Sequence, residues 1–218
     1  MKYQLRDYQK KASDAAVMCF KMKSDRNGLL VLPTGAGKSL IIADIAARLE
    51  EPLIVFQPNK EILEQNFAKL QTYGIWDCSI YSASVGRKEI SRITFATIGS
   101  VIRHMKDFQH FKNILIDECH LVKPSDGMYK RFFEQAERRI VGLTATPYRL
   151  YSCMNGSMLK FLTRTRPRVF SQVLYYCQVS ELLAKGFLSR LKYYDVTRID
   201  LTKVRRNSSG ADFDDASL

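Results

Sequence analysis

A glycine-rich loop between an apolar run and a helical pattern constrains the fold of this chain more than any other feature. The loop, Pro33-Thr-Gly-Ala-Gly-Lys-Ser39, follows the apolar residues 28–32 and precedes a helical pattern over residues 38–49. Glycines allow backbone N–H groups to turn inward toward an anion, and the amino end of a helix adds positive potential there. The spacing therefore predicts a phosphate-binding loop.

Two side chains of this loop have the chemistry that a nucleoside triphosphate requires. Lys38 would reach the β- and γ-phosphates, and the Ser39 hydroxyl would bind Mg²⁺. The full pattern begins with a small residue where this chain has Leu32, so the match is incomplete although every phosphate-contacting residue is present. A glycine-rich turn that only caps a helix is the competing interpretation. The predicted phosphate-binding residues are Thr34, Gly35, Ala36, Gly37, Lys38 and Ser39.

Strand-like and helix-like segments alternate as far as Pro147. This alternation, with strands that are apolar on both faces, predicts an α/β fold: a mostly parallel sheet flanked by helices. After Pro147 we expect a short helix over residues 180–185 that ends at Gly186, a strand over 190–196 and a polar tail. The expected helices are residues 7–23, 38–49 and 60–73, the last with Asn59 as its N-cap. The expected strands are residues 28–32, 53–57, 78–81, 93–97, 113–117 and 140–144.

A second group of reactive side chains follows one of these strands, in the sequence Ile114-Leu-Ile-Asp-Glu-Cys-His120. Ligands bind at the carboxyl ends of strands in open α/β sheets. There Asp117 would hold Mg²⁺ through water, and Glu118 would polarise the attacking water. The alternatives are a zinc site, for which His104 and His110 lie on a separate segment, a Cys119/His120 nucleophile pair, and an acid-rich helix start.

The overall charge favours a polyanionic partner or a solvated basic face. The formal net charge is +12, and residues 149–206 contain twelve basic residues against three acidic ones. Five scattered cysteines with no CxxC motif indicate reduced thiols in a cytoplasmic protein. No signal peptide or membrane span is expected, because no long apolar run is present.

Three motifs in order carry a family resemblance. Thr34-Gly-Ala-Gly-Lys-Ser39, Asp117-Glu-Cys-His120 and Gly142-Leu-Thr-Ala-Thr-Pro147 resemble motifs I, II and III of superfamily 2 helicases. Leu5-Arg-Asp-Tyr-Gln9 resembles their glutamine motif, and segments 57–65 and 95–100 resemble motifs Ia and Ib. The Asp-Glu-Cys-His form and residues 146–150 are similar to RadD-type helicases and to type III restriction helicase subunits.

The resemblance implies a RecA-like P-loop NTPase lobe over residues 1–200, with 201–218 leading toward a second lobe. It implies ATP and Mg²⁺ as ligands, with Glu118 and Lys38 catalytic and Ser39 and Asp117 holding the metal. Gln9, Arg6 and Tyr3 would contact adenine. For Tyr3, a packed aromatic residue at the start of the helix is an equally strong alternative. His120 and Thr144, Ala145 and Thr146 would couple nucleotide state to nucleic-acid binding. The nucleic-acid contacts would be Pro58, Asn59, Thr97, Gly99, Ser100 and Arg149.

A superfamily 2 motor needs a second RecA-like lobe that supplies arginine fingers. No such motif and no second phosphate loop follow residue 150, and about 70 residues are too few for another lobe. We therefore expect the first lobe of an ATP-dependent DNA helicase or translocase, monomeric and nearly inactive by itself. A fragment is favoured over a natural short protein. An RNA helicase lobe and a non-motor nucleic-acid-binding module with a structural nucleotide loop are the alternatives.

Overall fold

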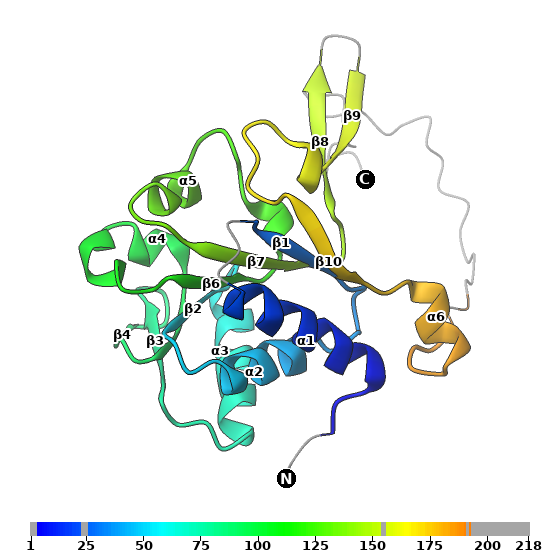
Figure 1. Cartoon of the computed structure of the whole chain (residues 1–218), viewed down its shortest axis with the longest axis horizontal. Helices are drawn as coiled ribbons and strands as arrows, with labels where there is room; N and C mark the ends of the chain where they lie inside the picture. Colours follow the sequence, from blue (N-terminus) through cyan, green and yellow to red (C-terminus); the bar gives the residue numbers. More distant parts are fainter. Residues whose placement is uncertain (1–3, 23–25, 154–155, 191, 193–218) are drawn as a thin grey trace, which may run out of the picture.

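One eight-stranded sheet forms the centre of the computed structural model, which describes residues 4–22, 26–153, 156–190 and 192 (Figure 1). The strand order is β10-β1-β7-β6-β2-β5-β3-β4, and all strands run parallel except β4, which pairs antiparallel with β3 at one edge. The strands are β1 (Gly28–Val31), β2 (Leu53–Phe56), β3 (Cys78–Ser82), β4 (Arg87–Lys88), β5 (Ile93–Ala96), β6 (Asn113–Ile116), β7 (Arg139–Thr144) and β10 (Gln172–Tyr176).

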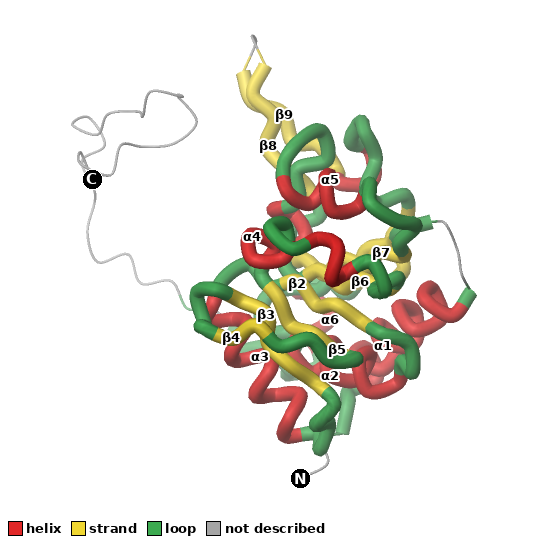
Figure 2. Tube along the Cα trace, turned by 90° about the vertical axis from the view of Figure 1, so that its left-hand side faces the viewer, coloured by secondary structure: helices red, strands yellow, loops and turns green. Residues whose placement is uncertain are grey.

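Helices cover both faces of this sheet (Figure 2). One face is covered by α1 (Asp7–Lys21), α2 (Lys38–Arg48) and α3 (Lys60–Thr72), and the other by α4 (Ile98–Val101) and α5 (Met128–Phe133). This arrangement confirms the predicted parallel α/β sheet with helices on both sides. None of the helices in the described part of the chain is long and apolar enough to span a bilayer. The remaining elements are α6 (Val179–Ala184) and the 3₁₀ turns η1 (Met105–Phe108), η2 (Cys119–Leu121) and η3 (Leu162–Arg164).

The central strands β2, β5 and β6 are buried on both faces, so successive residues enter two different hydrophobic clusters. In β6, Ile114 and Ile116 pack beneath α4 and α5, whereas Leu115 packs with α1, α2 and α3. A strand that is apolar on both faces is shielded from water only when a layer of helices covers each face of the sheet. The apolar runs noted in the sequence thus account for the three-layer structure.

Several predicted element ends are confirmed at the level of individual contacts. The Asn59 side chain accepts a hydrogen bond from the Ile62 backbone N–H at 2.9 Å and so caps α3. At the other end of the chain, α6 stops before Gly186, whose φ of +68° lies in the left-handed region. The predicted bounds of α1, α2 and the first six predicted strands agree with the structure to within two residues.

After Pro147 the structure contains three strands that the sequence analysis did not predict. Strands β8 (Tyr148–Cys153) and β9 (Gly156–Phe161) form an antiparallel hairpin, and β10 pairs parallel with β1. The hairpin exposes large apolar residues, and β10 is only partly buried, so neither shows the burial-driven pattern of a core strand. Of the strand expected over 190–196, only residues 190 and 192 are described, and neither is in a strand; the expected linker 201–218 lies outside the described residues.

Strand β10 makes β1 an internal strand. The Asn27 side chain, just before β1, donates a hydrogen bond to Val169 O at 3.0 Å and accepts one from Ile140 N at 2.9 Å. One amide thus joins the starts of β1 and β7 to the segment that leads into β10. The strand that carries the glycine-rich loop is therefore fixed on both sides.

Gly142 in β7 provides a test of how closely this sheet packs against η2. A Cβ placed there would lie 2.6 Å from Cys119 Sγ and 2.8 Å from a ring carbon of Phe170, whereas at Gly99 it would meet nothing within 4 Å. We expect Gly142→Ala to lower the free energy of unfolding by about 1–3 kcal/mol through overpacking, measured by urea unfolding. Gly99→Ala is the matched control, and an equal loss in both variants would contradict this account.

Candidate nucleotide-binding site

The glycine-rich loop connects the end of β1 to the start of α2 in a conformation that needs its two glycines. Gly35 has φ +82° and Gly37 has φ +76°, a region that side chains with a Cβ rarely adopt. A Cβ on Gly37 would also lie 2.5 Å from Gln9 Nε2, and one on Gly35 would lie 2.9 Å from Leu188 Cδ2. The loop is thus enclosed by α1 on one side and by the segment after α6 on the other.

The start of α1 holds this loop through a single carbonyl group. Ala36 O accepts hydrogen bonds from Tyr8 Oη and from Gln9 Nε2, each at 2.9 Å, and Gln9 is 3% exposed. The other amide atom, Gln9 Oε1, accepts from the Arg6 backbone N–H at 2.9 Å. Gln9 therefore links the glutamine motif directly to the phosphate loop, and its predicted contact with adenine stays a prediction.

An aromatic residue from the end of the described chain completes this corner of the site. The Arg6 guanidinium lies 4.1 Å from the ring centroid of Phe187, and the Tyr8 ring lies 5.8 Å from the same ring. The sequence analysis missed Phe187 because only the tertiary fold brings residue 187 to residue 6. Tyr3, the third predicted adenine contact, lies outside the described residues.

A cavity of about 1040 Å³ opens between the loop and α6. Pro33 and Thr34 line it on one side, Ala145 of motif III on a second and Leu183 of α6 on a third. A volume of this order accommodates a ligand of nucleotide size. The cavity thus brings together motifs I and III.

The loop lysine and the predicted catalytic glutamate form an ion pair. Lys38 Nζ contacts Glu118 Oε1, with both side chains largely buried. Glu118 has φ +48°, and it is the only residue other than glycine with a positive φ among those described. Backbone strain of this kind costs about 1–3 kcal/mol and occurs most often at functional sites. An incoming phosphate would have to compete with this carboxylate for Lys38.

Asp117 is a buried carboxylate at the end of β6, 5% exposed. Its oxygens accept hydrogen bonds from Glu118 N at 3.0 Å and from Asn66 Nδ2 at 3.2 Å. Burial raises the pKa of Asp117 above its usual value, and the nearby Lys38 opposes this shift. A desolvated carboxylate of this type is stabilised by a divalent cation, so the residues present fit Mg²⁺, with Ser39 of α2 as the other predicted ligand.

His120 connects motif II to motif III. Its Nδ1 lies 3.0 Å from Thr144 Oγ1 and 3.3 Å from Glu118 Oε2. The tautomer of the imidazole decides whether Nδ1 donates to Thr144 Oγ1 or accepts from it. Thr144 Oγ1 in turn accepts from the Thr146 backbone N–H at 3.0 Å. The structure therefore brings together three of the four predicted coupling residues, and the fourth, Ala145, lines the cavity.

Asn66 of α3 is a site residue that the sequence analysis missed. Besides donating to Asp117, it has a second amide atom, Oδ1, that is buried without a hydrogen-bond partner among the described residues. The sequence contained a signal for it. Asn66 is a polar residue on the face of α3 that also contains the buried Leu63, Phe67 and Leu70. Asn66 links the predicted metal ligand to the helix that begins in motif Ia.

Burial of Cys119 raises the pKa of its thiol well above the usual value. This residue is 0% exposed and packs closely against the position of Gly142. Because the thiolate is the nucleophilic form, a thiol with a raised pKa is poorly suited to nucleophilic catalysis. Its environment supports the role of a small packing residue.

The predicted nucleic-acid contacts have different environments. Pro58 and Gly99 are half-buried, and Asn59 is exposed. Ser100 is 7% exposed, and its hydroxyl accepts from Ala83 N at 2.9 Å and lies 3.0 Å from Thr97 Oγ1, so it is already engaged within motif Ib. Arg149 donates to Val122 O at 2.7 Å, which fixes motif III to the turn after motif II. Contact of these residues with a strand stays a prediction.

Comparison with known proteins agrees with the motif assignment. Residues 2–149 match the family described as "Type III restriction enzyme, res subunit". The chain is 29% identical over 151 residues to the DNA 3'-5' translocase XPB2 of Sulfurisphaera tokodaii, covering 68% of this chain and 32% of that protein. It is 29% identical over 154 residues to the DNA 3'-5' helicase XPB of Mycobacterium tuberculosis, a match that covers 66% of this chain and 27% of that protein.

A helicase domain of known structure shares the fold. The helicase domain of Hef from Pyrococcus furiosus superposes with a TM-score of 0.62 at 17% identity, covering 87% of this chain and 41% of that one. The RecA-like fold and the resemblance to the amino-terminal lobe of superfamily 2 helicases are thereby confirmed. The chain spans about a third or less of the length of the two curated relatives.

The burial of Asp117 generates a prediction about stability. Because its pKa is raised in the folded chain, this residue contributes stability below pH 3.8 that is lost as pH rises through the folded pKa. We expect Asp117→Asn to increase the free energy of unfolding at pH 7.5 in EDTA, and the gain to vanish as pH approaches 3.8. Asn66 can rotate its unpaired Oδ1 toward the new amide.

Urea unfolding at several pH values measures this difference, with Asp126→Asn, an exposed aspartate, as the control. Lower stability of Asp117→Asn at neutral pH would show that the carboxylate is stabilising in the absence of metal.

Proposed function

This chain belongs to the family of type III restriction enzyme res subunits, and we propose that it is the ATP-binding lobe of an ATP-dependent DNA helicase or translocase. The observation that carries the proposal is the convergence of Lys38, Asp117 and Glu118 where α2 begins and β6 ends. These three side chains supply a phosphate contact, a metal ligand and a general base. Together with Ser39 they form the set that phosphoryl transfer to water requires.

Each residue has a separable task in this proposal. Lys38 would leave Glu118 and bind the β- and γ-phosphates, and Ser39 and Asp117 would hold Mg²⁺. The metal would neutralise charge on the phosphates. Glu118, released from Lys38, orients and deprotonates the attacking water. His120, which contacts both Glu118 and Thr144, would then pass a change in the position of Glu118 to motif III.

Complete activity is proposed to require a second lobe. Arginine fingers contribute about 10³-fold or more to turnover in related enzymes, and none is found after residue 150. We propose that this chain alone binds Mg-ATP, hydrolyses it very slowly and does not separate strands. The matched segment covers only 32% of the Sulfurisphaera tokodaii relative, and the additional length of that protein supports this division of labour.

DNA is the proposed polymer, because two curated relatives carry DNA in their names. An RNA helicase lobe is a second candidate, since a putative ATP-dependent RNA helicase of African swine fever virus is 27% identical over 164 residues. Stimulation of the two-lobed protein by polydeoxynucleotide or by RNA separates these two. A non-motor module with a structural nucleotide loop would bind nucleic acid without responding to Mg-ATP.

Binding of mant-ATP tests the nucleotide site. Because Lys38 supplies a charge-assisted contact worth about 1.5–3 kcal/mol, Lys38→Ala is expected to weaken binding about 10- to 100-fold. Mg²⁺ should strengthen binding to the unaltered chain but not to Asp117→Asn. Lys11→Ala, on an exposed turn of α1, is the matched control. Binding of equal strength to the Lys38→Ala variant would support the structural-loop alternative.

His120 provides a test of coupling. We expect His120→Ala to retain affinity for mant-ATP but to lose the change in that affinity caused by a single-stranded oligonucleotide, typically about 5-fold or more in coupled systems. Thr144→Val, which removes the partner of His120, should have the same effect, and His104→Ala should have none. Normal coupling in both altered proteins would exclude the His120–Thr144 contact as the link.

A further inference from the structure

The hairpin β8–β9 projects from the body of the lobe in two perpendicular views (Figures 1 and 2). Its strands pair only with each other, in a two-stranded sheet separate from the main one. Buried Leu162, Thr165 and Phe170 anchor the chain that leaves it, with exposures of 3%, 2% and 2%. The base of the hairpin is thus fixed, while its strands extend away from the sheet.

One face of this hairpin is an exposed ladder of large apolar side chains. Tyr148 lies opposite Phe161, and Leu150 lies opposite Leu159. Their exposures are 39%, 54%, 54% and 59%, and the rings of Tyr148 and Phe161 meet edge to face with centroids 6.4 Å apart. An isolated two-stranded hairpin is marginally stable, and a contiguous apolar surface of this kind usually marks an interaction site.

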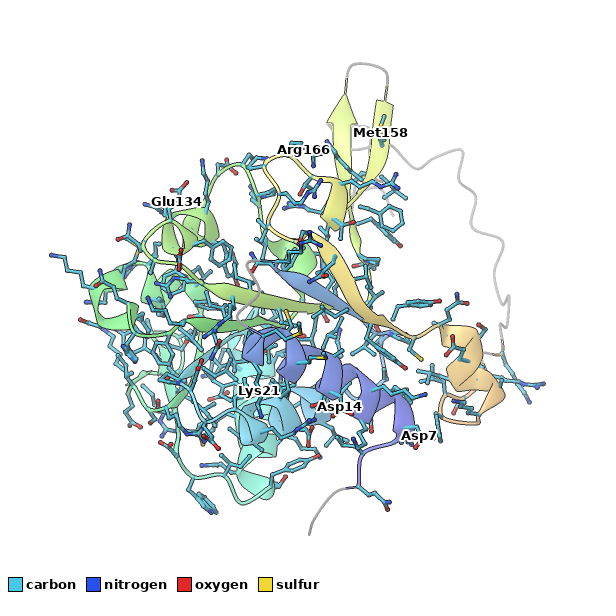
Figure 3. All side chains as sticks on the ribbon, viewed as in Figure 1. Asp7, Asp14, Lys21, Glu134, Met158 and Arg166 are labelled. Carbon is cyan, nitrogen blue, oxygen red and sulfur yellow. The ribbon has the colours of Figure 1, made fainter. Side chains whose placement is uncertain are left out.

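The charge around the ladder is of one sign. Residues 138–180 contain seven arginines and lysines and no aspartate or glutamate. Arg149 and Lys160 are directly opposite each other on the second face of the hairpin, so this face also has positive charge. Arg164, Arg166 and Arg168 are exposed on the loop that follows, and Figure 3 shows Arg166 on this loop beside the hairpin.

We propose that the hairpin and the arginine loop (residues 164–168) form a binding site for single-stranded nucleic acid. Bases stack on Tyr148 and Phe161, and phosphates contact Arg164, Arg166 and Arg168. Aromatic faces bind bases of any sequence, while cations follow the backbone, which is how single strands are held without sequence preference. The inference deepens the proposed function and rests on it for the choice of polymer.

Charge complementarity selects this occupant over two others. A second copy of this chain, with a net charge of +12, would be repelled by a segment, residues 138–180, that contains no aspartate or glutamate. A second lobe could cover the apolar ladder but would not by itself account for three adjacent exposed arginines. The hairpin also begins directly after Thr146 and Pro147, so a strand bound there lies next to the segment that contacts His120.

A single-tryptophan reporter tests the stacking. Trp76 is the only tryptophan and is 73% exposed on the loop before β3, so Trp76→Phe leaves an unlabelled background. In the 218-residue chain carrying Trp76→Phe and Phe161→Trp, we expect oligo(dT) of about 20 nucleotides to quench the fluorescence, because bases stack on the indole. The unaltered chain, with Trp76 alone, should show no quenching.

Fluorescence anisotropy of labelled oligo(dT) measures the two contributions separately. Phe161→Ala should weaken binding about 5-fold or more without changing the salt dependence, as expected for a lost stacking contact. Replacement of Arg164, Arg166 and Arg168 by Gln should lower the slope of log affinity against log salt by about 0.7 for each lost phosphate contact. Trp76→Ala and the double variant Lys11→Gln and Lys21→Gln are the controls.

The outcomes separate this inference from the proposed function. Oligonucleotide binding unchanged in Phe161→Ala and in the arginine variant would overturn the hairpin site, even with normal mant-ATP binding. If the fluorescence of the Phe161→Trp reporter is quenched only by a higher protein concentration or by an added second lobe, and not by oligo(dT), the apolar ladder is a protein-contact surface. That result would also overturn the hairpin site. Loss of mant-ATP binding in the unaltered chain would instead remove the proposed function.

Discussion

Parallel strands of similar length end at one edge of the sheet, and every chemical feature of this lobe depends on that constraint. The glycine-rich loop follows β1, the coupling threonines end β7, the two carboxylates follow β6, and motif Ia follows β2. These strands are consecutive in the sheet order β1-β7-β6-β2. Side chains 80 residues apart in the chain therefore lie within hydrogen-bond distance, as Lys38 and Glu118 do.

The site is held together by contacts among its own residues, and the nucleotide of the proposed function would replace or extend them. Lys38 is paired with the carboxylate of Glu118, which also faces His120, and the loop carbonyl of Ala36 is held by Tyr8 and Gln9. Because the loop already has left-handed turns at Gly35 and Gly37, a bound phosphate would require little rearrangement of its backbone. The strained backbone of Glu118 lies at the residue that forms the ion pair with Lys38.

Much of the fold was predictable because its signals are local. Apolar runs such as residues 113–117, the N-cap Asn59 and the glycines of the loop act within a few residues, and all appear as predicted. Phe187, Asn66 and strand β10 were not predicted, because each acquires its role from a distant partner: Arg6, Asp117 and β1 respectively. The hairpin was missed for the opposite reason, since its apolar residues face solvent and leave no pattern of burial.

Strand β10 shows that the last recognisable motif is not the end of the folding unit. Strands β7 and β10 run in the same direction. The chain therefore leaves β7 at the carboxyl ends of the strands and must return to their amino ends before it enters β10. The connection must therefore cross one whole face, and the buried Leu162 and Phe170 hold it there. Since the chain is anchored on both sides of the hairpin, a change in the length or sequence of the hairpin need not move the phosphate loop.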